Sequence, residues 1–214
     1  MTPMLLFAAV AATSVAFIVV QQAAPRRWGY VTKPLPMLLL LAGLFACGSP
    51  RDGTMRALVA AGLAASLAGD LLLVDAERGF LAGLASFLVA HLLYVAAFLR
   101  GVPLAPAAPC AAGYLALGVA LCAWLWPRLG KLRAPVAVYA LALVSMCAAA
   151  CARGAADRSL VAPIGATLFL LSDGILAVDR FRAPFRAAKP LLFALYIAGQ
   201  ALITASAWGG PIPS

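Results

Sequence analysis

The sequence consists of long uncharged apolar runs separated by short polar turns, and this alternation constrains the fold more than any other feature. A helix needs about 20 predominantly apolar residues to cross the hydrocarbon core of a lipid bilayer. Eight runs approach or reach that length, and regular polar breaks between them are typical of a helical bundle with tight connections. We expect the spans at residues 4–20, 35–48, 57–74, 80–99, 104–126, 134–152, 160–178 and 190–208.

The first two runs have unusual beginnings. The run at residues 4–20 lacks the basic segment that precedes the apolar core of a signal peptide, so we expect a retained transmembrane helix. The run at residues 35–48 is short. We expect its helix to extend back through Val31, with Lys33 reaching along it toward the interface and Pro34 in its first turn.

The composition supports a membrane protein without a separate soluble domain. Hydrophobic residues make up 65% of the chain and charged residues 11%, whereas a soluble domain is about half apolar and a quarter charged. We therefore expect one all-α polytopic domain over residues 1–214, embedded in the lipid bilayer. The net charge of +9 is spread over the loops and forms no basic face, so nucleic acid is not an expected partner.

The cysteines all lie within apolar runs and include no CxxC pair. They are Cys47, Cys110, Cys122, Cys147 and Cys151. Zinc sites need clustered Cys and His ligands, and the chain has one histidine, His91. We therefore interpret the cysteines as packing residues and expect neither a structural disulfide nor a metal site among them.

Basic residues are unevenly divided between the two sets of loops. The first, third, fifth and seventh loops carry eleven of the 16 Lys and Arg residues, and the opposite side carries five. The positive-inside rule then places the odd-numbered loops in the cytoplasm and both termini outside it. Arginine outnumbers lysine, as is typical of a GC-rich bacterial genome, so we expect a multi-pass protein of a bacterial inner membrane.

Two acidic residues, Asp70 and Asp173, fall inside expected spans, while the other five lie in loops. A carboxylate in lipid is costly and is by default a candidate functional residue, although a structural pair with a buried lysine or tyrosine is the alternative. The third and seventh helices run in the same direction, and each aspartate lies a turn or slightly more before the odd-loop end. We therefore expect the two carboxyl groups at one membrane depth.

The same end of the bundle collects further polar side chains. Lys33, Tyr139 and Tyr196 lie early in helices that enter from this end, His91, Tyr94 and Gln200 lie deeper, and Ser172 adjoins Asp173. Each has a structural alternative, as an interfacial anchor, an aromatic-belt residue or a core histidine. Together they predict a polar cavity that an amphiphilic substrate enters sideways from one leaflet.

Helical spacing groups several of these residues on common faces. Phe87, His91 and Tyr94 share one face of the fourth span, and Phe193, Tyr196 and Gln200 share one face of the eighth. Gly69-Asp70 and Ser172-Asp173 are each followed by an apolar turn. This likeness is compatible with a parallel 4+4 duplication of two four-helix halves.

Several short motifs occur in a specific order along the whole chain. They are Lys33-Pro34-Leu35, Gly69-Asp70-Leu71-Leu72, His91-Leu92-Leu93-Tyr94, Gly165-Ala166 with Phe169, Ser172-Asp173, and Tyr196-Ile197-Ala198-Gly199-Gln200. In order and spacing these motifs resemble the YhhN-like lysoplasmalogenase family. The resemblance implies an eight-helix hydrolase that cleaves the vinyl ether bond of lysoplasmalogens, which are lysophospholipid-like amphiphiles, to a fatty aldehyde and a glycerophospho-headgroup.

Hydrolysis of a vinyl ether needs an acid and a base, because the β-carbon is protonated, water adds to the resulting oxocarbenium ion, and the hemiacetal collapses. Asp70 and Asp173 are the candidates, since a carboxyl group in a low-dielectric site tends to hold a proton and one beside a cation tends to stay ionised. His91 or a tyrosine would orient the water, and Lys33 or nearby arginines would bind the phosphate. The other expected substrate-binding residues are Tyr94, Tyr139, Ser172, Tyr196 and Gln200. This chemistry needs no cofactor.

Two alternatives remain open for the same residues. Asp70, His91 and Asp173 form a plausible two-carboxylate, one-histidine metal set, although we expect no metal. A proton-coupled transporter or a lipid-binding membrane protein would use the two aspartates as a proton relay. A nucleophilic mechanism at Ser172 has less support, because neighbours in a helix point about 100° apart and the sequence has no GxSxG motif.

Overall fold

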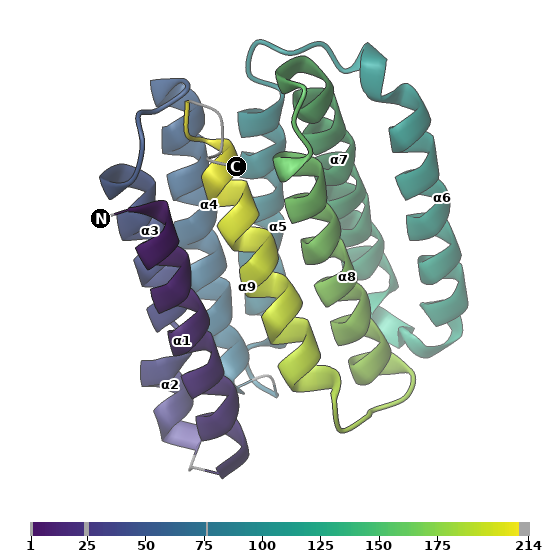
Figure 1. Ribbon diagram of the computed structural model, residues 1–214. Coiled ribbons are helices and arrows are strands. Elements are labelled where there is room, and N and C mark those ends of the chain that lie inside the picture. Colours follow the sequence, from purple (N-terminus) through teal and green to yellow (C-terminus); the bar gives the residue numbers. More distant parts are fainter. Residues whose placement is uncertain (1, 24–25, 76, 210–214) are drawn as a thin grey trace.

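The computed structural model describes residues 2–23, 26–75 and 77–209, which form a bundle of helices running up and down along one axis (Figure 1). Its elements are α1 (Pro3–Ala23), η1 (Arg26–Trp28), α2 (Gly29–Thr32), α3 (Leu35–Ala46), α4 (Gly53–Leu72), η2 (Leu73–Asp75), α5 (Phe80–Phe98), η3 (Ala105–Ala107), α6 (Ala108–Leu125), η4 (Trp126–Arg128), η5 (Gly130–Leu132), α7 (Arg133–Asp157), α8 (Val161–Phe181) and α9 (Ala188–Ser206). Within the described residues, eight helical segments are long and apolar enough to cross a membrane. The expected all-α protein with eight transmembrane helices is confirmed.

The second span is a helix interrupted at Lys33 and Pro34. α2 leads into α3, and together they form one apolar segment, Gly29–Ala46. Proline has no backbone N–H to donate, so the helix is interrupted here although the chain continues along the same span. The second span therefore extends back through Val31, as expected, but α2 is a separate short helix and Lys33 reaches Asp70 rather than the interface.

Successive spans alternate in direction, and the start of α1 and the end of α9 lie at the same end of the bundle (Figure 1). We call this the even-loop end and the opposite one the odd-loop end. α4 packs along α5 and α8 along α9, while α7 contacts both α5 and α8. α6 lies at the outer edge, packs mainly on α7 and contacts α8 at fewer positions. The 4+4 duplication stays a prediction.

α8 and α9 pack closely because two glycines face each other. A Cβ on Gly165 would lie 3.0 Å from the carbonyl oxygen of Gly199, and a Cβ on Gly199 would lie 2.8 Å from the carbonyl oxygen of Gly165. Small residues allow membrane helices to approach and to gain van der Waals contact. This approach brings Tyr196 of α9 against Phe169 of α8, whose ring centroids are 5.3 Å apart.

α7 continues to Asp157, past the expected end of the sixth span at residue 152. Its buried Arg153 donates from Nε to the carbonyl oxygen of Phe98 at 3.1 Å and from Nη2 to the carbonyl oxygen of Arg100. The last carbonyl groups of a helix lack intrahelical donors. Arg153 supplies donors for α5 and the turn that follows it, which explains why an arginine is buried near the even-loop end.

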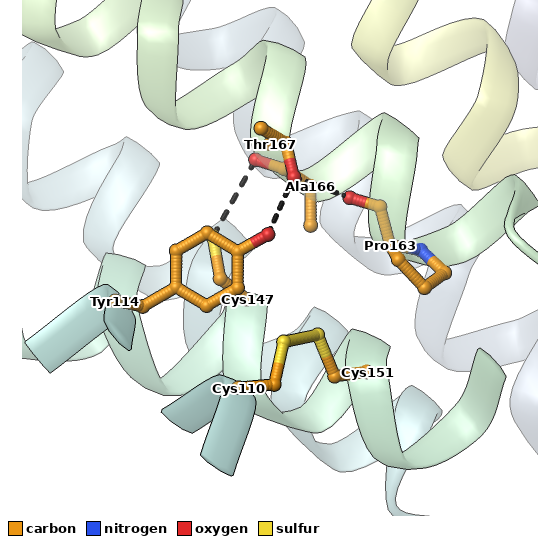
Figure 2. Close-up of a disulfide and its surroundings, with 7 residues drawn as sticks. All are labelled: Cys110, Tyr114, Cys147, Cys151, Pro163, Ala166 and Thr167. Atoms are coloured by element: carbon orange, nitrogen blue, oxygen red, sulfur yellow. Dashed lines mark hydrogen bonds between the residues drawn. A yellow bond between two sulfur atoms is a disulfide. The ribbon is translucent and has the colours of Figure 1, made fainter. Parts of the chain in front are cut away.

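Cys110 and Cys151 form a disulfide between α6 and α7 (Figure 2). The interpretation of all cysteines as packing residues is therefore wrong for this pair. The two helices are antiparallel neighbours, and their Cα atoms at these positions are 6.6 Å apart, within the range that a disulfide bridges. Cys110 and Cys151 are separated by 41 residues, and nothing in that spacing indicates which cysteines face each other.

Candidate active site

Asp70 lies near the odd-loop end of α4 and is almost completely buried. Lys33 reaches it from the break between α2 and α3: its Nζ is 3.2 Å from Asp70 Oδ1 and donates to the Asp70 carbonyl oxygen at 3.0 Å. Tyr196 of α9 donates its hydroxyl proton to Asp70 Oδ2 at 2.7 Å. The structure thus brings three of the predicted site residues together from three separate spans, and it gives the carboxylate a cation and a hydroxyl donor.

A second set of hydrogen bonds lies on the even-loop side of Asp70. Tyr94 donates its hydroxyl proton to Gln200 Oε1 at 2.7 Å, and Gln200 Nε2 donates to Ser66 Oγ at 3.0 Å. All three side chains are buried, so these bonds satisfy groups that would be costly to leave unpaired. Ser66 was not among the predicted site residues. Its spacing of i, i+4 from Asp70 on one helix face is the signal that indicates it.

Asp173 has a different environment, on α8 between α5 and α7. Tyr139 of α7 donates its hydroxyl proton to Asp173 Oδ2 at 2.5 Å. His91 of α5 places its Nε2 3.8 Å from the same oxygen. Among the described residues, neither ring nitrogen of His91 has a hydrogen-bond partner, although the side chain is fully buried. His91 therefore keeps two polar atoms available beside a carboxyl group.

Phe169 separates the surroundings of the two aspartates. Its buried ring contacts His91 on the Asp173 side, with centroids 4.9 Å apart, and Tyr196 on the Asp70 side, with centroids 5.3 Å apart. Both contacts are edge-to-face, an arrangement that aromatic rings prefer. Phe169 was not among the predicted site residues, because an aromatic residue in an apolar run is indistinguishable in the sequence from an ordinary core residue.

An apolar groove between α6, α7 and α8, partly covered by α5, reaches Asp173. We call it the α6 groove and define it by Gly118 and Leu121 of α6, Val144 of α7, and Leu170 and Gly174 of α8. Asp173 and Tyr139 also line it. The groove differs from the polar cavity that we expected. The walls of the groove are mostly apolar, and Asp70 is not among its lining residues.

Ser172 points away from the Asp173 partners described above. Its hydroxyl donates to the carbonyl oxygen of Leu192 on α9 at 2.8 Å, so it links α8 to α9. The alternative metal set of Asp70, His91 and Asp173 is not assembled: in residues 2–23, 26–75 and 77–209, no group of three or more His, Cys, Asp or Glu side chains is placed to hold a metal ion. Asp70 has Lys33 as its partner instead.

Comparison with known proteins gives one consistent family. The model of the YhhN family matches residues 28–207. Human lysoplasmalogenase TMEM86B is 39% identical over 183 residues, which cover 86% of this chain and 76% of the human protein. A lysoplasmalogenase of Mycobacterium tuberculosis is 37% identical over 186 residues, covering 81% of this chain and 68% of that protein.

A bacterial relative without an assigned activity covers a similar part of the chain. The uncharacterized membrane protein YhhN of Escherichia coli O157:H7 is 33% identical over 184 residues, which cover 85% of this chain and 86% of that protein. No solved structure matches the chain significantly. The family model spans all but the first of the eight transmembrane segments, and the described helices agree with a multi-pass membrane protein. The chain belongs to the YhhN family.

Proposed function

We propose that this protein is a membrane-embedded lysoplasmalogenase, which hydrolyses the vinyl ether bond of a lysoplasmalogen. The names of the human and mycobacterial relatives support the reaction class. The observation that carries the proposal is the position of Asp173, whose side chain lines an apolar groove beside a tyrosine hydroxyl and a histidine that has no hydrogen-bond partner among the described residues. An amphiphile in that groove would have its hydrocarbon in apolar surroundings and its ether bond beside an acid.

The reaction needs one proton donor and one water molecule. A carboxylic acid protonates the β-carbon of the vinyl ether, and the electron pair of the double bond forms the new C–H bond. The oxocarbenium ion that results takes up water at the α-carbon and loses a proton to the carboxylate, giving a hemiacetal. Collapse of the hemiacetal breaks the C–O bond and yields a fatty aldehyde and a glycerophospho-headgroup with a free hydroxyl, so one water is consumed and the acid is regenerated.

The surroundings of the two aspartates suggest different roles. Asp173 has no lysine or arginine partner among the described residues and borders the groove, so we assign it the proton transfer. Asp70 is held by Lys33 and Tyr196 and lies behind Phe169. We assign it the role of the ionised carboxylate that favours positive charge on the reacting carbon, as the second carboxyl group does in glycosidases.

His91 is the candidate for orienting the water. The separation of 3.8 Å between His91 Nε2 and Asp173 Oδ2 is too long for a direct hydrogen bond and suits a water molecule that contacts both groups. Packing of the imidazole between the rings of Tyr139 and Phe169 holds its orientation. A water placed there would be close to the groove and to the carboxyl group that accepts its proton.

The remaining predicted residues have supporting positions. Tyr139 fixes the Asp173 carboxyl group through its hydroxyl, and Tyr196 does the same for Asp70. Tyr94 and Gln200 lie behind Asp70 in hydrogen bonds with each other and with Ser66. Binding of the substrate phosphate by Lys33 stays a prediction, because the structure gives its ammonium group a carboxylate partner.

The direct test is lipid mass spectrometry with the purified protein in detergent. Lysoplasmalogen should yield a fatty aldehyde, whereas the ester-linked lysophospholipid of the same headgroup should not be cleaved. Because no gradient exists in detergent, aldehyde release would contradict a transporter. Movement of the lipid across vesicle membranes without any new product would contradict the hydrolase and favour the transporter or lipid-binding protein.

A further inference from the structure

The α6 groove ends on its even-loop side at a polar contact between α6 and α8. Tyr114 Oη and Thr167 Oγ1 are 2.6 Å apart, and Thr167 also donates to the carbonyl oxygen of Pro163 at 2.7 Å. Figure 2 shows the Tyr114 ring extending across from α6 toward α8, near the Cys110–Cys151 disulfide. These interactions attach the first half of α6 to the bundle and form a floor below Leu170 and Gly118.

Cationic side chains lie around the odd-loop side of the same groove. The guanidinium of Arg180 lies 4.9 Å from the ring centroid of Phe80, a groove residue, and that of Arg182 lies 4.6 Å from the ring centroid of Trp124 on α6. Cation–π contact holds each guanidinium in place but leaves hydrogen-bond donors at its edges. In the part of the chain that the structure describes, neither arginine is paired with a carboxylate. Both can therefore bind an anion.

The dimensions of α8 fit an amphiphile between these two boundaries. A helix rises about 1.5 Å per residue. Asp173 is therefore about 12 Å from the end of α8 at Phe181 and about 9 Å from Thr167. A glycerophospho group on the odd-loop side and a hydrocarbon chain on the even-loop side would place the ether bond between them at Asp173.

The groove is also open to the lipid. α6 packs mainly on α7 and reaches α8 at few positions, of which Tyr114 is one, and most of its side chains are exposed on the protein surface. In a membrane these surfaces contact lipid tails, so a chain can enter sideways between α6 and α8 without crossing a polar region. An excess of hydrocarbon beyond the floor can leave through the same opening.

We propose that the α6 groove is the binding site for the hydrocarbon chain of a lysophospholipid. Arg180 and Arg182 hold its phosphate, and the Tyr114–Thr167 contact forms the floor that orders the chain. This assignment rests on the proposed hydrolase function and identifies the substrate-binding half of that site. It assigns the phosphate to two arginines rather than to Lys33, whose ammonium group is engaged by Asp70.

Gly118 offers the sharpest test of the chain site. A Cβ at this position would lie 2.7 Å from Val144 Cγ2, so Gly118→Leu must displace Val144 while it adds bulk to the groove that both residues line. We expect kcat/KM for a long-chain lysoplasmalogen to fall at least about tenfold relative to that for a short-chain one. Gly113→Leu is the matched control, because it adds the same side chain to the same helix where nothing lies within 4 Å. Equal losses on both substrates would overturn the chain assignment.

Val144→Ala provides the opposite change and guards against a Gly118 variant that does not fold. It removes two methyl groups from the same part of the groove, so we expect the preference to shift toward longer or branched chains. An unchanged preference in a folded Val144→Ala protein would contradict the assignment.

The phosphate site has its own test. The double variant Arg180→Gln with Arg182→Gln should raise KM about tenfold or more with little change in kcat, whereas Arg128→Gln in the neighbouring loop should leave KM unchanged. An unchanged KM in the double variant would overturn the arginine assignment.

Cys122 gives a readout that does not depend on hydrolysis. This thiol lines the groove and is partly exposed, whereas Cys47 and Cys147 are buried. In bilayer nanodiscs, a non-cleavable alkyl ether lysophospholipid should abolish alkylation of Cys122, and glycerophosphate alone should not. Protection without any vinyl ether cleavage by the wild type would support the groove and overturn the hydrolase. Cleavage by the wild type without protection would overturn the groove and leave the hydrolase standing.

Discussion

His91 Nε2 lies 3.8 Å from Asp173 Oδ2, and the imidazole has no hydrogen-bond partner among the residues that the structure describes. A buried polar group without a partner costs free energy, so natural proteins rarely keep one without a reason. The ring is well packed, since it contacts Tyr139 and Phe169 edge-to-face. A residue that is fixed by packing and unsatisfied in hydrogen bonding is suited to binding a small polar molecule during a reaction.

His91→Phe separates the packing role from the chemical one. Phenylalanine keeps an aromatic ring between Tyr139 and Phe169 but has no nitrogen, so we expect kcat to fall about 10²-fold. The melting temperature should stay the same or rise, because two unsatisfied buried polar atoms are removed. Kinetics and thermal melts in one detergent measure both effects. Normal kcat in the folded variant would exclude His91 from the mechanism.

The Lys33–Asp70 ion pair predicts a stability effect that depends on which partner is changed. Lys33→Met leaves a buried carboxylate without its cation, and we expect the free energy of unfolding to fall by about 3–5 kcal/mol. Adding Asp70→Asn removes that charge and should recover most of the loss. Lys189→Met, at an exposed lysine of the same end, is the control.

Denaturation in mixed micelles measures the stability of the single and double variants. A Lys33→Met protein as stable as the Lys189→Met control would show that the ion pair contributes nothing to stability.

The same variants test phosphate binding by Lys33. If Lys33 binds the phosphate, Lys33→Met should weaken substrate binding, measured as a rise in KM, by more free energy than the variant loses in folding stability. An unchanged KM would leave Lys33 with Asp70 as its sole partner in the site.

The orientation of the bundle has support from two separate features. The odd-numbered loops carry eleven basic residues against five, and the Cys110–Cys151 disulfide lies toward the even-loop end. Disulfides persist outside the cytoplasm, so both features favour termini outside it. A reporter that is active only outside the cytoplasm should therefore be active when fused after Ser214. Activity of a cytoplasmic reporter at the same position would reverse the orientation.

The spans and their polar residues were predictable, because length, hydropathy and helical spacing are properties of one segment at a time. Residues predicted on common faces do meet across helices: Phe87 contacts Tyr196, and Tyr94 bonds to Gln200. Pairing across helices was not predictable. The bond between Cys110 and Cys151 and the role of Phe169 depend on how α7 and α8 face their neighbours, which no local pattern indicates.

The division of the two aspartates between separate environments has the same origin. Asp70 and Asp173 are equivalent in the sequence, as lone carboxyl groups in apolar helices near the same end. Their difference comes from neighbours: Lys33 reaches Asp70 from the break in the second span, and α6 leaves a groove open beside Asp173. A peripheral helix and an interrupted one are therefore what give two similar residues different surroundings.

The two aspartates allow the strictest test of the proposed mechanism. Asn preserves the shape of the side chain, but it can neither deliver an acidic proton nor carry the negative charge that favours an oxocarbenium ion. Asp173→Asn and Asp70→Asn should each lower kcat at least about 10²-fold while the protein remains folded. Tyr139 and Tyr196 can still donate to the amide oxygen of the new side chain, which favours a folded protein in both cases.

The double variant decides whether Asp70 and Asp173 act together. Residues that act as a unit are grossly non-additive, so Asp70→Asn with Asp173→Asn should be scarcely slower than the slower single variant. Independent contributions would instead multiply the two losses. Glu77→Gln removes an exposed carboxylate outside the site and should leave kcat unchanged. A single variant with near-normal aldehyde release would remove that aspartate from the mechanism, and activity in both would leave the two carboxyl groups with structural or transport roles.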